Sequence, residues 1–324
     1  DLMKNLLRAH RENVTRMDGL SPEARAKALE KIDLLTVKVG YPDKWRDYSS
    51  VTVDRANLVG SIQNSYQFGW DQHLKRLFEN VDRSEWTMSP PTVNAYYNTS
   101  ANEIVLGAGI LQPPFFDPEA DDAVNYGSIG SLIGHEIGHG FDDDGWKYDG
   151  RGVYQGWVTA ADSTNFKTRA NVLVEQYSGY EPLPGYKVNG QLTLGENIAD
   201  LAGLVIARQG YHLSLKGKKA PVLDGYTGDQ RFYLAYAQRK RGKVTNALMR
   251  YRVLSNCHSP SEYRVNGVVR NDDGWYEAFD VKPGDKLYLP PEQRVRLWGE
   301  VAAQTADGGS GTSGGARESG PSRD

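Results

Sequence analysis

Apolar residues in the first part of the chain recur at the three- and four-residue spacing of one helix face. The segment Ser21-Pro22-Glu23-Ala24 is a typical helix start, because serine caps free N–H groups and proline fits the first turn. We therefore expect helical structure from Leu2 to Val39, ended by Gly40-Tyr41-Pro42. The apolar face of its second half comprises Ala28, Leu29, Ile32, Leu35 and Val37.

The rest of the pattern predicts one short extended region and several more helices. Helical spacing returns from Val53 to Phe78, before the breaker Pro90-Pro91. Val93 to Tyr97 and Glu103 to Leu106 predict a hairpin-like pair of edge strands. Further helices are expected near residues 121–140, 159–180, 194–212 and 228–250. The pattern thus predicts a mainly helical α+β fold with a small edge-strand sheet.

The composition is that of a folded protein without a strong overall charge. Hydrophobic residues make up 39% of the 324 residues, which excludes wholesale disorder. A net charge of −3 gives no overall field for nucleic acid or an anionic membrane, so nucleic acid is not expected as a partner and any recognition must be local. The longest apolar stretch, Leu201 to Ala207, is far shorter than the roughly 20 residues of a membrane helix. The single cysteine, Cys257, excludes an intrachain disulfide framework.

The strongest chemical signal is the pair His135 and His139 with Glu136 between them. On a helix, residues four apart lie on the same face, so both imidazoles can reach one metal ion. Glu136 is then placed to act as general base on a water at the metal. A chance occurrence of this spacing is the alternative, but the segment lies in a predicted helix that begins at Asp121-Asp122.

A catalytic zinc site needs a third protein ligand, and Glu196 is the best candidate. Glu196 and Asp200 share one face of an otherwise apolar predicted helix, where buried carboxylates need a cation or a hydrogen-bond partner. Two imidazoles and a carboxylate favour zinc, although cobalt or manganese could substitute in vitro. Asp200 is expected to orient a ligating histidine, most plausibly His135, through its second ring nitrogen. The competing interpretation is a solvated acidic edge.

With these motifs, three other segments make the chain resemble the catalytic portion of the neprilysin family of zinc metallopeptidases, which includes endothelin-converting enzymes and bacterial oligopeptidase O-type endopeptidases. The segments are residues 93–97, residues 104–116 and His258-Ser259-Pro260-Ser261-Glu262-Tyr263-Arg264-Val265-Asn266-Gly267. The resemblance implies a gluzincin-like (thermolysin-like) metallopeptidase catalytic domain that binds one Zn²⁺ and hydrolyses peptides.

The resemblance also implies roles for residues outside the metal motif. Asn94 and Ala95 match edge-strand residues that bind the substrate backbone, as in strand addition to a sheet. Arg264 matches an arginine that binds a substrate carbonyl, and His258 matches a histidine that stabilises the oxyanion, although its polar surroundings alone suggest a surface histidine. The pocket for the side chain after the cleaved bond corresponds to Ile110, Phe115 and Leu132, which from the pattern alone are equally well ordinary core.

Two departures from the family pattern are visible. Where the family ends in Cys-x-x-Trp, this chain has Val295-Arg296-Leu297-Trp298, which favours a bacterial-type member. The sequence leaves the compartment open, and a bacterial periplasmic or secreted location is the favoured expectation. Where relatives often carry an aromatic residue after Ala-Gln, this chain has the basic run Arg239-Lys240-Arg241. The simplest interpretation of that run is a solvated helix end, and an altered subsite preference is the alternative.

The chain divides into three predicted parts. Residues 1–50 are expected to be a helical connecting segment from an N-terminal region that this chain lacks, and residues 51–304 the catalytic domain. Residues 305–324 hold six Gly and four Ser and are expected to be a disordered tail. In the family, the N-terminal helical region closes over the site, so it is an expected partner beside the peptide substrates.

Two classes of function fit the sequence. The first is a zinc endopeptidase that cleaves on the amino side of hydrophobic residues with Glu136 as general base. The second is a catalytically silent peptide-binding fragment that lacks the lid. A single-residue exopeptidase is less favoured, because no acidic cluster near the edge-strand motif could bind a free amino terminus.

Overall fold

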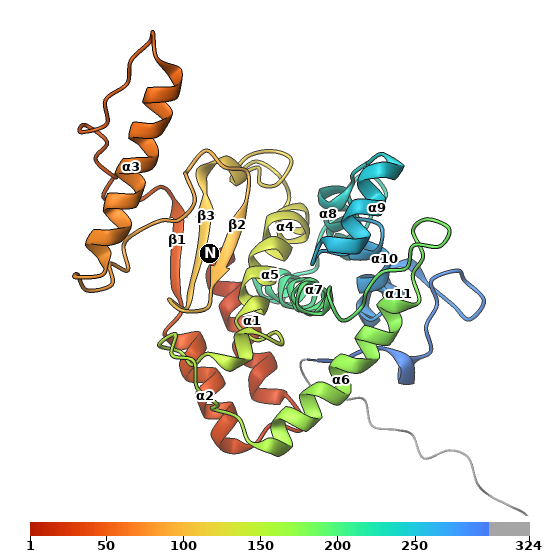
Figure 1. Cartoon of the computed structure of the whole chain (residues 1–324). Helices are drawn as coiled ribbons and strands as arrows, with labels where there is room; N and C mark the ends of the chain where they lie inside the picture. The colour runs from red at the N-terminus through yellow and green to blue at the C-terminus, as the bar shows by residue number, and fades with distance from the viewer. Residues whose placement is uncertain (298–324) are drawn as a thin grey trace, which may run out of the picture.

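The core of the molecule is a pair of closely packed helices, α5 (Ser131–His139) and α7 (Leu194–Ser214). The computed structural model describes residues 1–297 (Figure 1). Glycines allow the two backbones to approach, because a Cβ atom on Gly134 would lie 2.8 Å from the carbonyl oxygen of Gly203. A Cβ atom on Gly203 would lie 2.6 Å from the carbonyl oxygen of Ser131. The polar side chains on these helices are therefore held close together.

A three-stranded sheet lies beside α5, with strand order β1-β3-β2. Strands β2 (Ala95–Asn98) and β3 (Glu103–Gly107) are antiparallel with Ala95 opposite Leu106, which confirms the predicted strand pair. Strand β2 is at the edge of the sheet that contacts α5.

The third strand, β1 (Thr36–Gly40), corrects the predicted helix to Val39. Its Val37 pairs in parallel with Ile104 of β3, and Lys38 forms a 2.7 Å ion pair with Glu103. These partners are far away in sequence, and a β-branched run is suited to a strand once such a partner is present.

The N-terminal helices are α1 (Leu2–Arg16) and α2 (Pro22–Asp33). Ser21 caps α2 by accepting a hydrogen bond from the backbone N–H of Ala24, as its sequence predicts. Helix α1 packs against α7, so this part of the chain contributes to the main core. The buried residues of α1 are Leu6, Ala9, His10, Asn13 and Val14.

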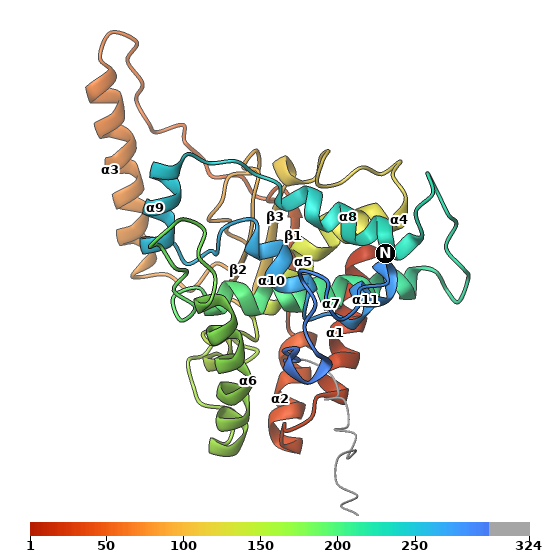
Figure 2. The same ribbon diagram turned by 90° about the vertical axis from the view of Figure 1, so that its right-hand side faces the viewer.

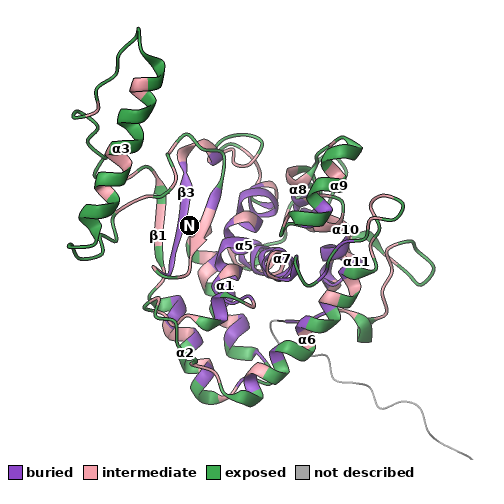
Figure 3. Ribbon diagram, in the orientation of Figure 1, coloured by how far each residue is buried: buried purple, intermediate pink, exposed green. Residues whose placement is uncertain are grey.

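Helix α3 (Leu58–Arg76) confirms the predicted helix in this region, but it projects away from the body of the molecule (Figures 1 and 2). None of its residues is buried, whereas the buried residues concentrate on α5, α7 and β3 (Figure 3). Its exposed large hydrophobic residues follow helical spacing at Leu58, Ile62, Tyr66, Trp70 and Leu74.

The predicted helix near 121–140 is built from α4 (Asp122–Asn125), a π-helical turn (Tyr126–Gly130) and α5. Helix α6 (Ala160–Ser178) and α7 match their predictions, and Thr159 with Asp162 forms a capping box at the start of α6. Short 3₁₀ helices cover Ala108–Ile110, Gly145–Lys147 and Pro291–Gln293.

The predicted helix near 228–250 is divided into α8 (Gly228–Lys240) and α9 (Asn246–Ser255). The chain is extended at Arg241, and Thr245 starts α9 by accepting a hydrogen bond from Leu248. Helices α10 (Tyr263–Val269) and α11 (Asp273–Phe279) follow.

The mainly helical α+β fold class is confirmed. Within residues 1–297, no helix has both the length and the apolar character needed to cross a membrane. The predicted tail at 305–324 lies outside the described residues, as does Trp298 of the C-terminal motif.

Candidate metal centre

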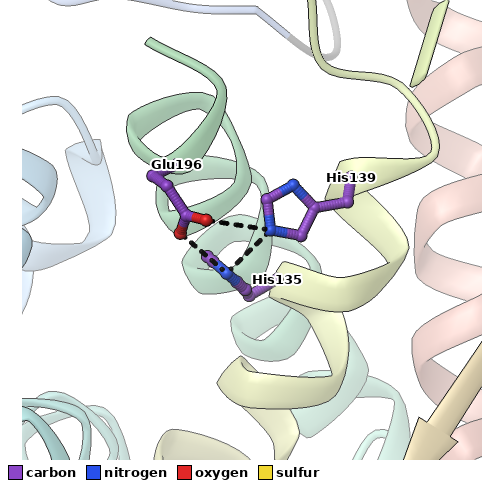
Figure 4. A group of neighbouring side chains, drawn as sticks. All are labelled: His135, His139 and Glu196. Carbon is purple, nitrogen blue, oxygen red and sulfur yellow. Dashed lines mark hydrogen bonds and ion pairs between the residues drawn. The ribbon is translucent and has the colours of Figure 1, made fainter. Parts of the chain in front are cut away.

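Helix α5 brings the two predicted histidine ligands together. The Nε2 atoms of His135 and His139 lie 3.1 Å apart, and their rings meet edge to face (Figure 4). Glu136 is buried beside them on the same helix. The four-residue spacing therefore produces the arrangement that the sequence predicts.

Glu196, in the first turn of α7, completes the group. Its carboxylate oxygens lie 3.3 Å from Nε2 of His135 and 3.6 Å from Nε2 of His139. In a tetrahedral zinc site with bonds of about 2.0 to 2.1 Å, neighbouring ligand atoms are separated by about 3.3 Å. The three side chains therefore fit a zinc ion in both chemistry and spacing, and they are one of the groups of described residues that could hold a metal.

His139 is oriented by Asp142, which lies in the turn after α5 and is not among the predicted site residues. Oδ2 of Asp142 lies 2.7 Å from Nδ1 of His139, and Oδ1 accepts hydrogen bonds from the N–H groups of Asp144 and Gly145. Although burial lowers the pKa of His139, this hydrogen bond and the nearby carboxylates raise it to about 9. The available signal was the three-residue spacing from His139, which brings Asp142 back beside the histidine.

Asp200 lies beside His135, where the sequence places it, and it also binds two cations, so its role in orienting this histidine stays a prediction. Its Oδ1 lies 3.0 Å from Nδ1 of His135, but that oxygen accepts hydrogen bonds from Lys240 at 2.7 Å and from Arg264 at 2.8 Å. The His135 contact does not have hydrogen-bond geometry. Burial raises the pKa of Asp200, but Arg264 and Lys240 hold it well below its usual range. Asp200 is thus the centre of a buried charge cluster beside His135.

Glu196 is shared between the metal centre and two further residues. Burial alone raises its pKa, but the hydrogen bond and charge of His135, with His139 and Arg264, lower it to about 2. Nε2 of His258 lies 3.1 Å from Oε2 of Glu196, which brings His258 to the predicted site although it is partly exposed. Arg264, at the start of α10, donates to Glu196 at 3.3 Å and uses Nε and Nη2 to bind Asp200.

The predicted substrate-binding residues lie around this centre in different environments. Asn94 is exposed just before β2, and Ala95 is buried as its first residue, so they stand at the free edge of the sheet. Ile110 is buried in the core, whereas Phe115 and Leu132 are partly buried at its margin. The positions of these five residues do not test their roles in substrate binding, which stay predictions.

The solvated interpretation of the basic run is wrong for two of its three residues. Lys240 turns inward to Asp200, with only 8% of its side chain exposed. Arg239 donates from Nη2 to the Ser131 hydroxyl at 3.1 Å, and its Nε is buried. Only Arg241 is exposed. The local sequence could not show this, because α7 and α5 supply the groups that these side chains contact.

Two histidines four residues apart with a glutamate between them, joined by a carboxylate from a second helix, form the donor set of a zinc metallopeptidase. The sequence matches the profile of peptidase family M13 over residues 94–295. The chain belongs to this family, which confirms the resemblance to neprilysin and the endothelin-converting enzymes.

The similarity to known relatives covers almost all of this chain. It is 36% identical to neprilysin-11 of Caenorhabditis elegans, covering 92% of this chain and 36% of the relative. It is 33% identical to neutral endopeptidase of Lactobacillus helveticus, covering 92% of this chain and 44% of the relative. The crystal structure of zinc metalloprotease Zmp1 of Mycobacterium tuberculosis with an inhibitor matches with a TM-score of 0.89 and 52% identity, covering 91% and 46%. The chain thus spans less than half the length of these relatives.

Proposed function

We propose that this chain carries the active site of a zinc-dependent endopeptidase. The observation that carries the proposal is the convergence of His135, His139 and Glu196, with Glu136 buried beside them. These three residues would hold the zinc ion, which supplies a Lewis acid for the scissile carbonyl and lowers the pKa of a water. Membership of family M13 supports the same chemistry.

The chain's own residues supply the proton transfers and the charge stabilisation. Glu136 accepts a proton from the attacking water and returns it to the leaving amine. Asp142 fixes the ring of His139 through Nδ1, which leaves Nε2 as a lone-pair donor. His258 donates a hydrogen bond to the oxygen that becomes negative during attack. Its position beside Glu196 supports this role.

Substrate binding uses the edge of the sheet. The backbone at Asn94 and Ala95 pairs with an extended peptide, because β2 has a sheet neighbour on one side only within residues 1–297. Arg264 binds a substrate carbonyl, although Asp200 and Glu196 already engage two of its nitrogens. Ile110, Phe115 and Leu132 form apolar walls for the residue after the cleaved bond, which gives cleavage on the amino side of hydrophobic residues.

Metal analysis combined with a fluorogenic peptide assay tests this function. Stoichiometric zinc and chelator-sensitive cleavage of a peptide blocked at its amino terminus are expected. A folded, zinc-free chain that binds the peptide without cleaving it would instead identify the silent peptide-binding fragment. Cleavage of unblocked peptides alone would identify an exopeptidase.

A further helical region of the parent protein is the proposed partner of α3. The apolar stripe from Leu58 to Leu74 contacts nothing that would bury it among the described residues. A surface of this kind on a soluble protein is typical of an interface. We expect Trp70→Glu to leave the unfolding free energy of this chain within about 0.5 kcal/mol of the original. A larger loss would show that α3 already packs on this chain.

A further inference from the structure

Arg239 is a partly buried cation without an ion-pair partner in the described part of the chain. Its described hydrogen bond goes to a neutral group, the hydroxyl of Ser131, and its Nε has no partner there. No carboxylate among residues 1–297 lies within ion-pair distance of it. Other inward-facing arginines are paired with carboxylates, namely Arg208 with Asp272, Arg231 with Asp121 and Arg264 with Asp200.

A partly buried charge without an ion-pair partner loses some of its hydration, so a carboxylate that pairs with it would be favourable. Burial lowers the pKa of Arg239, but a guanidinium stays protonated in proteins. The ring of Tyr236, 5.7 Å from Cζ, offers a cation–π contact, which is weaker than a paired carboxylate. Asp200 is already compensated by both Lys240 and Arg264. None of the described carboxylates therefore forms an ion pair with Arg239, and an incoming anion can do so.

The position of Arg239 indicates where that anion would come from. Ser131, which it contacts, directly precedes Leu132, one of the proposed pocket walls. Ser131 also lies one helical turn before His135, so Arg239 contacts the turn of α5 that precedes the metal centre. Arg239 therefore lies beside the part of α5 that carries a proposed pocket wall and, one turn further on, a metal ligand.

We propose that Arg239 forms a carboxylate-binding subsite that selects peptides with a negative charge just beyond the cleaved bond. This inference rests on the proposed peptidase function. Apolar walls and a guanidinium suit either a glutamate side chain, whose methylene groups contact the walls, or a hydrophobic residue that carries the peptide's terminal carboxylate. The proposed subsite thus adds a preference for a negative charge to the proposed preference for hydrophobic residues after the cleaved bond.

Matched peptides test the subsite. One pair, blocked at both ends, differs only in Glu or Gln after the cleaved bond; the second pair has Leu there as the last residue, with a free carboxylate or an amide. Because a hydrogen bond to a charged group contributes about 1.5–3 kcal/mol, we expect about 10- to 100-fold higher kcat/KM for the charged member of at least one pair. The pair that responds identifies the source of the carboxylate. Equal rates within both pairs would overturn the proposal.

Arg239→Gln should remove this preference while the neutral peptides are still cleaved. The control is Arg241→Gln, the exposed residue of the same basic run, which should keep the preference. A preference unchanged in Arg239→Gln would contradict the role of this residue. Should Arg239→Gln fail to fold, the comparison of peptides on the original chain still decides the proposal.

Binding separates this inference from the proposed function. Fluorescently labelled versions of the same peptides are titrated onto the Glu136→Gln variant, with and without Arg239→Gln. Tighter binding of the charged peptide, lost with Arg239→Gln, supports the subsite even in a chain that cleaves nothing. If the original chain cleaves none of these peptides while the Glu136→Gln variant shows such binding, only the peptidase function is rejected. Binding that does not depend on the charge of the peptide would reject the subsite.

Discussion

Oδ2 of Asp142 lies 2.7 Å from Nδ1 of His139, so a residue in the turn after α5 orients the second histidine of the metal centre. The same carboxylate accepts hydrogen bonds from the N–H groups of Asp144 and Gly145. The turn and the ligand are thereby coupled through one side chain. Movement of this turn would change the direction in which His139 presents its Nε2 lone pair.

Asp142→Asn should lower zinc affinity by about 10- to 100-fold, as loss of a residue that orients a ligand does. The amide removes the negative charge that holds the ring. Zinc competition with a chromogenic chelator measures the effect. Asp144→Asn is the matched control, because Asp144 is exposed and pairs with Lys147 rather than with a ligand. Equal affinities of the two variants would show that the contact does not support the metal.

Glu136→Gln should retain zinc and lose most turnover, because an amide cannot accept the proton of the attacking water. Glu196→Gln should instead weaken zinc binding itself, because it replaces a ligand carboxylate. Zinc content and peptide cleavage are measured on both variants. Nearly full activity in Glu136→Gln would reject the assignment of the general base.

His258→Ala should lower kcat by about 10²- to 10³-fold with little change in KM, as removal of one oxyanion donor does. The effect is on kcat because the negative charge exists in the transition state and not in the bound substrate. His73→Ala, on exposed α3, is the control. A variant with the original kcat and unchanged zinc would place His258 outside the reaction.

His10 should make the fold sensitive to acid. Burial lowers its pKa to about 3 from 6.5, and its ring packs edge to face on Phe141. Between these two values the unfolded chain binds more protons than the folded chain, so stability is lost as pH falls through this range. The loss is about 1.4 kcal/mol per pH unit. Urea unfolding between pH 7 and pH 4 measures it.

His10→Phe preserves an aromatic ring at this position without a titrating group. Its unfolding free energy should therefore fall less steeply with pH than that of the original chain. Parallel slopes for the two proteins would show that His10 does not set the acid response. Zinc is removed from both samples, so that metal release at low pH does not contribute.

The sequence by itself determined the features that depend on local spacing. His135 and His139 face the same point because a helix repeats every 3.6 residues, and Ser21 and Thr159 begin helices because their side chains reach nearby N–H groups. The family motifs also indicated Glu196 and His258, which the fold brings together. The boundaries at residues 50 and 304 and a periplasmic or secreted location in a bacterium stay predictions.

Only the tertiary structure decided how distant groups pair. Residues 36–40 form a strand because they pair in parallel with β3, and no local sequence pattern predicts that pairing. Lys240 is buried because Asp200 on α7 compensates its charge, whereas Arg239 meets a neutral hydroxyl on α5. The same basic run would be solvated on an isolated helix. Whether each basic side chain is buried or solvated depends on the charged and polar groups that the neighbouring helices place beside it. Ion pairing is set by distance in space and not by spacing along the chain.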